Sequence, residues 1–144
     1  MTTLHPRAAL CLLLATAAAC TPAADGIDPK GKTFDAVAPE EAVTLTGTEP
    51  FWTLAIAAGE GIWTTPDNQP GTRFAVKRFA GNNGLGFSGE LDGKPLTATL
   101  TPGECSDGMS DRRFPFVATI ALGGETFAGC GYTTSQPFTG DEAP

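Results

Sequence analysis

Between residues 43 and 132, apolar and polar side chains alternate in short runs, which Gly, Pro and Asp separate at nearly regular spacing. A period of two places every second side chain on the same face of an extended chain, as in a strand with one buried face. No window of useful length has the period of a helix. The runs predict eight short strands, at residues 43–46, 51–57, 62–65, 72–79, 85–91, 96–100, 116–122 and 126–132.

The same alternation predicts which side chains face the core and how the strands connect. In the second run Trp52, Leu54 and Ile56 share one face. Asp92-Gly93 and Gly123-Gly124 are typical of tight hairpins, so the strands should be antiparallel. Eight such strands in about 90 residues fit a small all-β barrel or a two-sheet sandwich. We favour the barrel, because closure removes open sheet edges.

The chain begins with a segment typical of a secretory leader. Arg7 is followed by a mainly apolar run at residues 8–19, which is short for a bilayer span but suits a signal-peptide core. The run ends in Ala17-Ala18-Ala19-Cys20, which resembles a bacterial lipobox with Ala17 where Leu is usual. We expect a signal peptide at residues 1–19 and lipid attachment at Cys20. The alternative is cleavage after Ala19 or Ala24 without a lipid.

The segments that flank the β domain have the composition of flexible chain. Residues 20–42 are rich in Pro, Gly and charge, and they predict a tether between the lipid and the domain. Residues 133–144 are expected to be a disordered tail. Thr21 follows Cys20, and an Asp at this position would favour retention at the inner membrane. The expected location is therefore the periplasmic side of the outer membrane, and a soluble periplasmic or secreted protein is the alternative.

Charge excludes several classes of function. Removal of the leader takes away His5 and Arg7 and leaves 8 basic and 16 acidic side chains, a net charge of −8. Such a chain repels phosphate backbones, so we expect no nucleic-acid binding, and anionic lipids would not attract it.

The mature chain also lacks histidine, so neither a Ser-His-Asp nor a Cys-His arrangement can form. We expect no enzyme and no cofactor.

The cysteines predict a disulfide. Cys11 leaves with the leader and Cys20 is assigned to the lipid, so Cys105 and Cys130 remain as a pair in an oxidising compartment. A bridge over this span stabilises a fold by roughly 3–4 kcal/mol, and it would join the last strand to the segment after Leu100. A metal pair or free thiols are the alternatives. The mature chain has no histidine and no C-x-x-C spacing, which argues against a metal site.

Two motifs carry a family resemblance. One is G-T-E-P-F-W at residues 47–52, and the other is C-S-D-G-M-S-D-R-R-F-P-F at residues 105–116, followed by Gly129-Cys130. Together they resemble an uncharacterised family of bacterial membrane-anchored or secreted envelope proteins, over about residues 43–132. Its members occur alone or beside META-type and lysozyme-inhibitor-type β modules. The resemblance implies an envelope role, and it carries no established activity to this chain.

The first motif has two interpretations. A residue before proline avoids the α region, so Glu49 should approach the strand in an extended conformation. The large apolar ring of Trp52 then fits a core plug at one barrel end, with Glu49 accepting backbone N–H groups. Alternatively, Trp52 and Glu49 form the floor and the polar anchor of a ligand pocket.

The second motif predicts a long loop. Ser106, Asp107, Ser110 and Asp111 can accept nearby backbone N–H groups, which would make a self-bonded scaffold. The alternative is an exposed recognition loop. Its candidate binding residues are Asp107, Met109, Asp111 and Arg112. Calcium is a third interpretation, although the Asp spacing lacks the EF-hand pattern.

Two functions follow from these features. The first is a non-catalytic envelope lipoprotein that binds a protein partner, for instance as an inhibitor of an envelope-active enzyme such as a lysozyme. The second is a structural or stress-related envelope component that binds a small apolar ligand.

Overall fold

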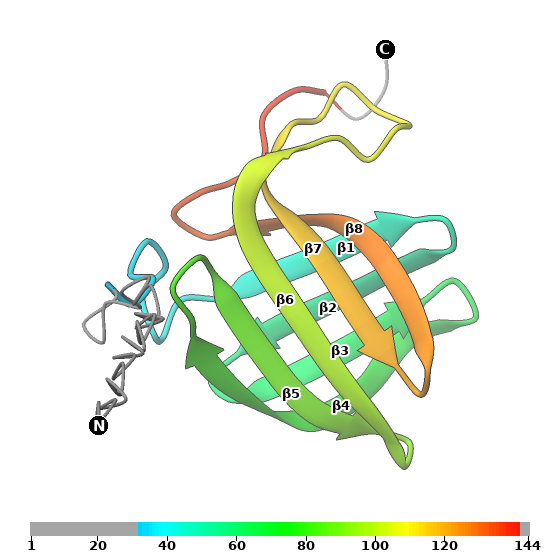
Figure 1. Cartoon of the computed structure of the whole chain (residues 1–144). Coiled ribbons are helices and arrows are strands. Elements are labelled where there is room, and N and C mark those ends of the chain that lie inside the picture. Colours follow the sequence, from blue (N-terminus) through cyan, green and yellow to red (C-terminus); the bar gives the residue numbers. More distant parts are fainter. Residues whose placement is uncertain (1–31, 142–144) are drawn as a thin grey trace, which may run out of the picture.

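Eight antiparallel strands close into a single barrel (Figure 1). The computed structural model describes residues 32–141, so the predicted leader, Cys20 and the first part of the tether lie outside the described residues. The all-β barrel predicted from the alternation is confirmed. The strands are β1 (Val43–Thr48), β2 (Phe51–Ala57), β3 (Glu60–Thr65), β4 (Asn68–Ala80), β5 (Leu85–Leu91), β6 (Lys94–Cys105), β7 (Phe114–Leu122) and β8 (Glu125–Thr133).

Each strand pairs with its neighbours in the sequence, and the pairing of β1 with β8 closes the barrel, with Val43 opposite Thr133. Four hairpin turns therefore gather at one end, which we call the mouth: those between β1 and β2, β3 and β4, β5 and β6, and β7 and β8. They line the right and lower right of Figure 1. The chain enters β1 at the opposite end, the base. The segment before the barrel and the mouth are thus on opposite sides of the domain.

Side chains fill the barrel interior, as expected for eight strands. The predicted inward face of β2 is confirmed, because Trp52, Leu54 and Ile56 are all buried. The largest fully buried side chains of the core are Phe87, Phe116, Leu45, Leu54, Leu96, Leu100 and Ile120. The predicted hairpin at Asp92-Gly93 is also present, with φ angles of 50° and 76° that suit a tight turn.

Two strands are longer than the alternation predicts, and each continues through a proline. β4 begins at Asn68 and contains Pro70, and β6 runs to Cys105 and contains Pro102. Residues 68–75 of β4 pair only with β3, and β6 beyond Leu100 pairs only with β7. A strand paired on one side tolerates a missing N–H, so proline does not end it.

The segment before β1 belongs partly to the domain. The sequence places the tether up to residue 42, whereas Val37 is only 2% exposed and packs in the core. Arg78 donates a hydrogen bond to the Val37 carbonyl oxygen at 2.8 Å, and the Phe34 N–H donates to Gly81 at the same distance. The expected tether therefore ends near Phe34. Val37 is flanked by Ala36 and Ala38 and belongs to no alternating run, so the period of two did not mark it as buried.

The segment after β8 packs against the barrel as far as the structure describes it. The expectation of a disordered tail from residue 133 is wrong for residues 133–141, because Thr133 ends β8 and the following residues pack on the barrel. Thr139 and Arg113 exchange backbone hydrogen bonds of 2.8 and 3.0 Å, and the Phe138 ring lies 5.2 Å from that of Tyr132. Ser135 donates from its N–H and its hydroxyl to the Glu41 carboxylate, at 2.7 and 2.5 Å. The segments before β1 and after β8 thus pack against the barrel and bond to each other through Glu41 and Ser135.

Candidate binding surface around Phe51

Trp52 lies inside the mouth end of the barrel, where two glycines make room for it. It is 2% exposed and pairs across the strands with Gly47. A Cβ added at Gly47 would lie 2.3 Å from the indole Nε1, and one at Gly129 would lie 2.8 Å from Cζ2. Gly47 of the G-T-E-P-F-W motif therefore makes room for the indole, and Gly129 makes room both for the indole and for the Thr46 carbonyl oxygen, which would lie 2.1 Å from an added Cβ.

Trp52 forms an aromatic cluster with Trp63 of β3 and Phe127 of β8. The indoles of Trp52 and Trp63 stack with centroids 5.4 Å apart and an interplanar angle of 11°. Phe127 meets both edge-on, at 6.4 and 5.8 Å. Such pairs contribute about 0.5–1.5 kcal/mol each beyond burial. The sequence interpretation had not singled out Trp63 or Phe127, although the inward alternation of the strands that flank Trp52 is the signal that places them there.

A pocket of about 460 Å³ opens at the mouth above this cluster. Hairpin turns from three pairs of strands surround it, and most of its wall is apolar. Its lining residues are Pro50, Phe51, Trp52, Trp63, Thr65, Pro66, Asp67, Leu122 and Phe127. Both roles considered for Trp52 are therefore present, because its ring fills one end of the core and also lines a pocket.

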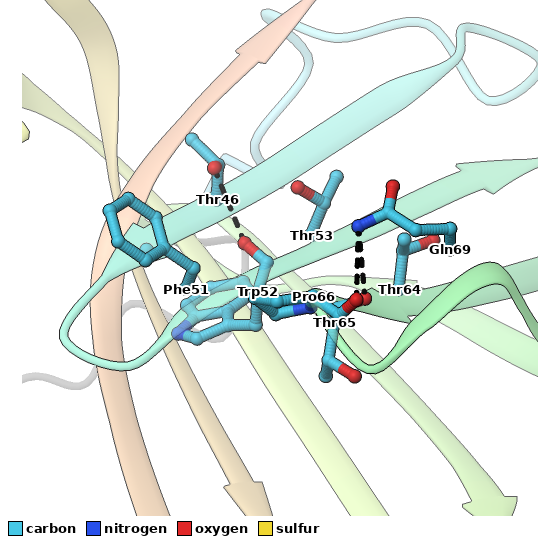
Figure 2. Close-up of a pocket in the computed structure, with 9 residues that line it drawn as sticks. Thr46, Phe51, Trp52, Thr53, Thr64, Thr65, Pro66 and Gln69 are labelled. Carbon is cyan, nitrogen blue, oxygen red and sulfur yellow. Dashed lines mark hydrogen bonds between the residues drawn. The ribbon is translucent and has the colours of Figure 1, made fainter.

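A smaller, more polar hollow of about 190 Å³ lies beside the mouth pocket (Figure 2). The hydroxyl groups of Thr46, Thr53 and Thr64 line it, and Gln69 closes one side by donating to the carbonyl oxygens of Thr65 and Pro66. Figure 2 shows the Phe51 ring and the Trp52 indole pointing to opposite sides of β2. Phe51 borders both hollows.

The loop between β6 and β7 adds a third hollow of about 330 Å³ on the other side of Phe51. The Thr48 hydroxyl donates to the Asp107 carbonyl oxygen at 3.0 Å, so the loop lies against the end of β1. The two motifs, 59 residues apart at this contact, are thereby brought together. The hollow is lined by Thr46, Gly47, Thr48, Phe51, Asp107, Met109, Ser110, Arg112 and Phe114.

Asp107 organises this loop from within. Its carboxylate accepts the Met109 and Ser110 N–H groups at 3.0 and 2.9 Å, and the Ser110 hydroxyl at 2.6 Å. These bonds, the Ser110 hydroxyl first, lower the pKa of Asp107. Arg112 places its guanidinium 4.5 Å from the centre of the Phe138 ring. The interpretation as a self-bonded loop thus fits Asp107, whereas the Arg112 side chain packs on the segment after β8.

The disulfide holds the base of the loop. The sulfur atoms of Cys105 and Cys130 lie 2.00 Å apart, as the cysteine count predicts. The bridge crosses β7 and ties the end of β6 to β8, and Cys130 is only 1% exposed beneath the loop. The loop therefore starts from a fixed point.

The remaining candidates divide in two. Met109 is 60% exposed and lines the loop hollow, and Asp111 is exposed beside it, so both are available to a partner. Glu49 is exposed in the first mouth turn, after which the peptide bond to Pro50 is cis. Its carboxylate accepts no hydrogen bond within residues 32–141, and it lines none of the three hollows. Neither the backbone acceptor nor the pocket anchor expected of Glu49 is present.

Residues 32–141 contain no group of three Asp, Glu, His or Cys side chains placed to hold a metal ion. Nor does this part of the chain contain a helix long and apolar enough to cross a membrane. Comparison of the chain with protein-family models, curated proteins and solved structures gave no match. The resemblance to an envelope family therefore stays a prediction.

Proposed function

We propose that this protein is a non-catalytic, lipid-anchored envelope protein that binds a protein partner through the surface around Phe51. One observation carries the proposal. Among residues 32–141 only four large hydrophobic side chains are exposed, and two of them, Phe51 and Met109, line the same hollow. Large apolar side chains that project together from a polar rim are typical of protein interfaces.

The surroundings of Phe51 support a preformed interface. Phe51 borders the mouth pocket, the polar hollow of Figure 2 and the loop hollow, so a partner could engage all three at once. The loop that carries Met109 is held by the disulfide and by the Asp107 hydrogen bonds. A loop that is already ordered loses less conformational entropy on binding, which favours affinity.

The two carboxylates with shifted pKa values are not suited to act as general acids. Glu41 and Asp107 have lowered pKa values, and local hydrogen bonds are the first cause in each case. A general acid at neutral pH needs the opposite shift. Both carboxylates stabilise segments of the fold instead.

The position of the chain entry suits an anchored protein. β1 begins at the base, and the mouth lies at the other end of the barrel. Under the proposal, the predicted tether runs from Cys20 to about Phe34, whose N–H bonds to Gly81 between β4 and β5 at the base. The Phe51 surface would then face away from the membrane and toward the periplasm.

A small apolar ligand is the second candidate, and the mouth pocket favours it. Its volume of about 460 Å³ lies within the range of small-molecule sites, roughly 300–1,000 Å³. Such a ligand would leave Met109 uncovered, because Met109 lines the loop hollow and not the mouth pocket. The protein partner accounts for both exposed side chains.

The test compares cross-linked partners of the membrane-extracted protein with those of a Phe51→Ser/Met109→Ser variant. We expect the variant to lose the partners that the wild type captures. The matched control is Phe79→Ser, which removes an equally exposed ring, 59% accessible, on the outer wall where it covers Gly86. Equal loss in the control, or unchanged capture by the double variant, would overturn the proposal. Melting temperatures of all three proteins show whether each remains folded.

A further inference from the structure

The four mouth turns each carry an exposed carboxylate. These are Glu49, Asp67, Asp92 and Glu125, one from each hairpin. None of the four makes a side-chain hydrogen bond or an ion pair with another described residue. Among the basic side chains of residues 32–141, Lys94 alone adjoins a mouth turn. Four carboxylates against one lysine leave a net negative charge at this end.

The centre of the same end is apolar. Trp63, Leu122 and Phe127 line the mouth pocket, and Asp67 lies at its wall. Of the four carboxylates only Asp67 lines this pocket, and Glu49, Asp92 and Glu125 lie in the other three turns of the same end. An apolar pocket at an end whose turns carry unpaired carboxylates, the rim charges, is complementary to an apolar side chain that has cations on either side. Binding of such a group would bury the pocket wall and relieve the repulsion among the rim charges.

We infer that the mouth is the docking site of a basic protein. An aromatic or aliphatic side chain of that protein enters the pocket, and flanking Lys or Arg residues meet Glu49, Asp67, Asp92 and Glu125. The inference rests on the proposed function and names the chemistry of its partner. Complementary charge also accelerates encounter and rejects acidic proteins.

The rim charge excludes other occupants of the pocket. A second copy of this chain would bring the same four carboxylates to the contact, and like charges face to face are costly. Phosphate backbones and anionic lipid surfaces are repelled for the same reason. A polypeptide with cations around an apolar side chain fits both the rim and the pocket.

Tryptophan fluorescence of the whole chain tests the inference directly. The chain has two tryptophans, and both Trp52 and Trp63 line the pocket, so the signal reports this site. The probe is the capped peptide Lys-Phe-Lys-Phe-Lys, which contains no tryptophan. We expect a saturable change that weakens as salt rises, since screening reduces exposed charge interactions. Capped Glu-Phe-Glu-Phe-Glu and Lys-Ala-Lys-Ala-Lys, which lack the cations and the rings respectively, should bind far more weakly.

Two charge-matched variants separate the rim from the net charge. Neutralising the rim in Glu49→Gln/Asp67→Asn/Asp92→Asn/Glu125→Gln should weaken peptide binding by about tenfold or more, because the exposed charge pairs with the three lysines of the peptide are removed. The control removes four carboxylates away from the mouth turns, in Asp35→Asn/Glu40→Gln/Glu60→Gln/Glu104→Gln, and should bind like the wild type.

The outcomes separate this inference from the proposed function. No response of the wild type to the lysine–phenylalanine peptide, or equal weakening in both charge variants, would overturn the basic partner. If capture still depends on Phe51 and Met109 in that case, the protein-binding function stands. If capture does not depend on them, the proposed function itself fails, whatever the peptide does.

Discussion

The indole of Trp52 lies over Gly129, so closely that a Cβ at that glycine would stand 2.8 Å from the indole Cζ2. The two residues are 77 positions apart, and they belong to different motifs. Their contact explains why one motif has a tryptophan and the other a glycine. The indole fills the mouth end of the core only if β8 has no side chain at that position. The same indole stacks on Trp63 and lines the mouth pocket. Stability of the barrel end and the shape of the pocket are thereby linked.

The first prediction concerns the glycines beneath the indole. Gly47→Ala should destabilise the protein by about 1–3 kcal/mol, the usual cost of overpacking a core, because the new methyl group would press on Nε1 at 2.3 Å. Gly103→Ala is the control, since its Cβ would meet only Val117, at 3.4 Å. Urea denaturation followed by tryptophan fluorescence measures both. Equal stability of the two variants would contradict this account of Trp52.

The second prediction concerns the bridge. Replacing both cysteines, as Cys105→Ser/Cys130→Ser, should lower the free energy of unfolding by roughly 3–4 kcal/mol, the entropy of closing a loop of about 25 residues. Urea denaturation of the wild type and the variant measures this cost. Adding a reductant should bring the wild type to the stability of the double variant and leave the variant unchanged. If the reductant has no effect on the wild type, the bridge is not formed in solution.

The alternation was a sufficient guide to the barrel for a physical reason. Each strand buries one face only, so a period of two identifies the inner residues, and turns such as Asp92-Gly93 mark the reversals. The start of β4 and the end of β6 were predicted too close to the strand centres, because Pro70 and Pro102 interrupt the pattern. Whether a strand pairs on one side only is a tertiary property that no local pattern contains. For the same reason, the burial of Val37 and the packing of Phe138 were not predicted, since both residues lie outside the alternating runs and pack through tertiary contacts.

The site was predictable in part. The motif residue Trp52 led to the pocket, but Trp63 and Phe127 join it only through the strand order and register. Glu49 misled the prediction, because its place in the motif does not show that its side chain points into solvent. The contact of Thr48 with Asp107 depends on a loop that folds back across β8, and nothing near either residue in the sequence indicates it.

The third prediction concerns acid stability. The Ser135 hydroxyl, with smaller contributions from Thr133 and the backbone, lowers the pKa of Glu41 from 4.5 to about 2. A carboxylate with a lowered folded-state pKa stabilises the fold above its unfolded pKa, and this stability is lost as the pH falls from about 4.5 to about 2. Glu41→Gln should be less stable than the wild type at pH 7, and the difference should shrink through that window.

Glu40→Gln is the neighbouring control for Glu41, because Glu40 is exposed. It should follow the wild type at every pH. Melting temperatures at half-unit steps from pH 7 to pH 2 test the comparison. A constant difference between Glu41→Gln and the wild type across the whole range would show that ionisation of Glu41 is not coupled to folding.

The fourth prediction concerns the anchor. If Cys20 is acylated, the membrane-extracted protein should be heavier than the chain from Cys20 by the mass of the lipid, and it should partition into the membrane fraction. Cys20→Ala should move the protein to the soluble periplasmic fraction with its barrel intact, because the described domain begins well after this residue. Continued membrane partition of Cys20→Ala would show that the lipid is not what holds the protein there.

The last prediction divides the loop between β6 and β7 into scaffold and contact residues. Asp107 accepts three hydrogen bonds within the loop, so Asp107→Ala should cost about 1–3 kcal/mol, because the freed N–H and hydroxyl donors lose their acceptor. Met109 is 60% exposed, so Met109→Ser should change stability by less than about 0.5 kcal/mol and still weaken capture of the envelope partner. Urea denaturation and cross-linking of both variants measure the two effects. A stable Asp107→Ala protein, or a Met109→Ser protein that captures its partner as the wild type does, would show that the loop is not divided in this way.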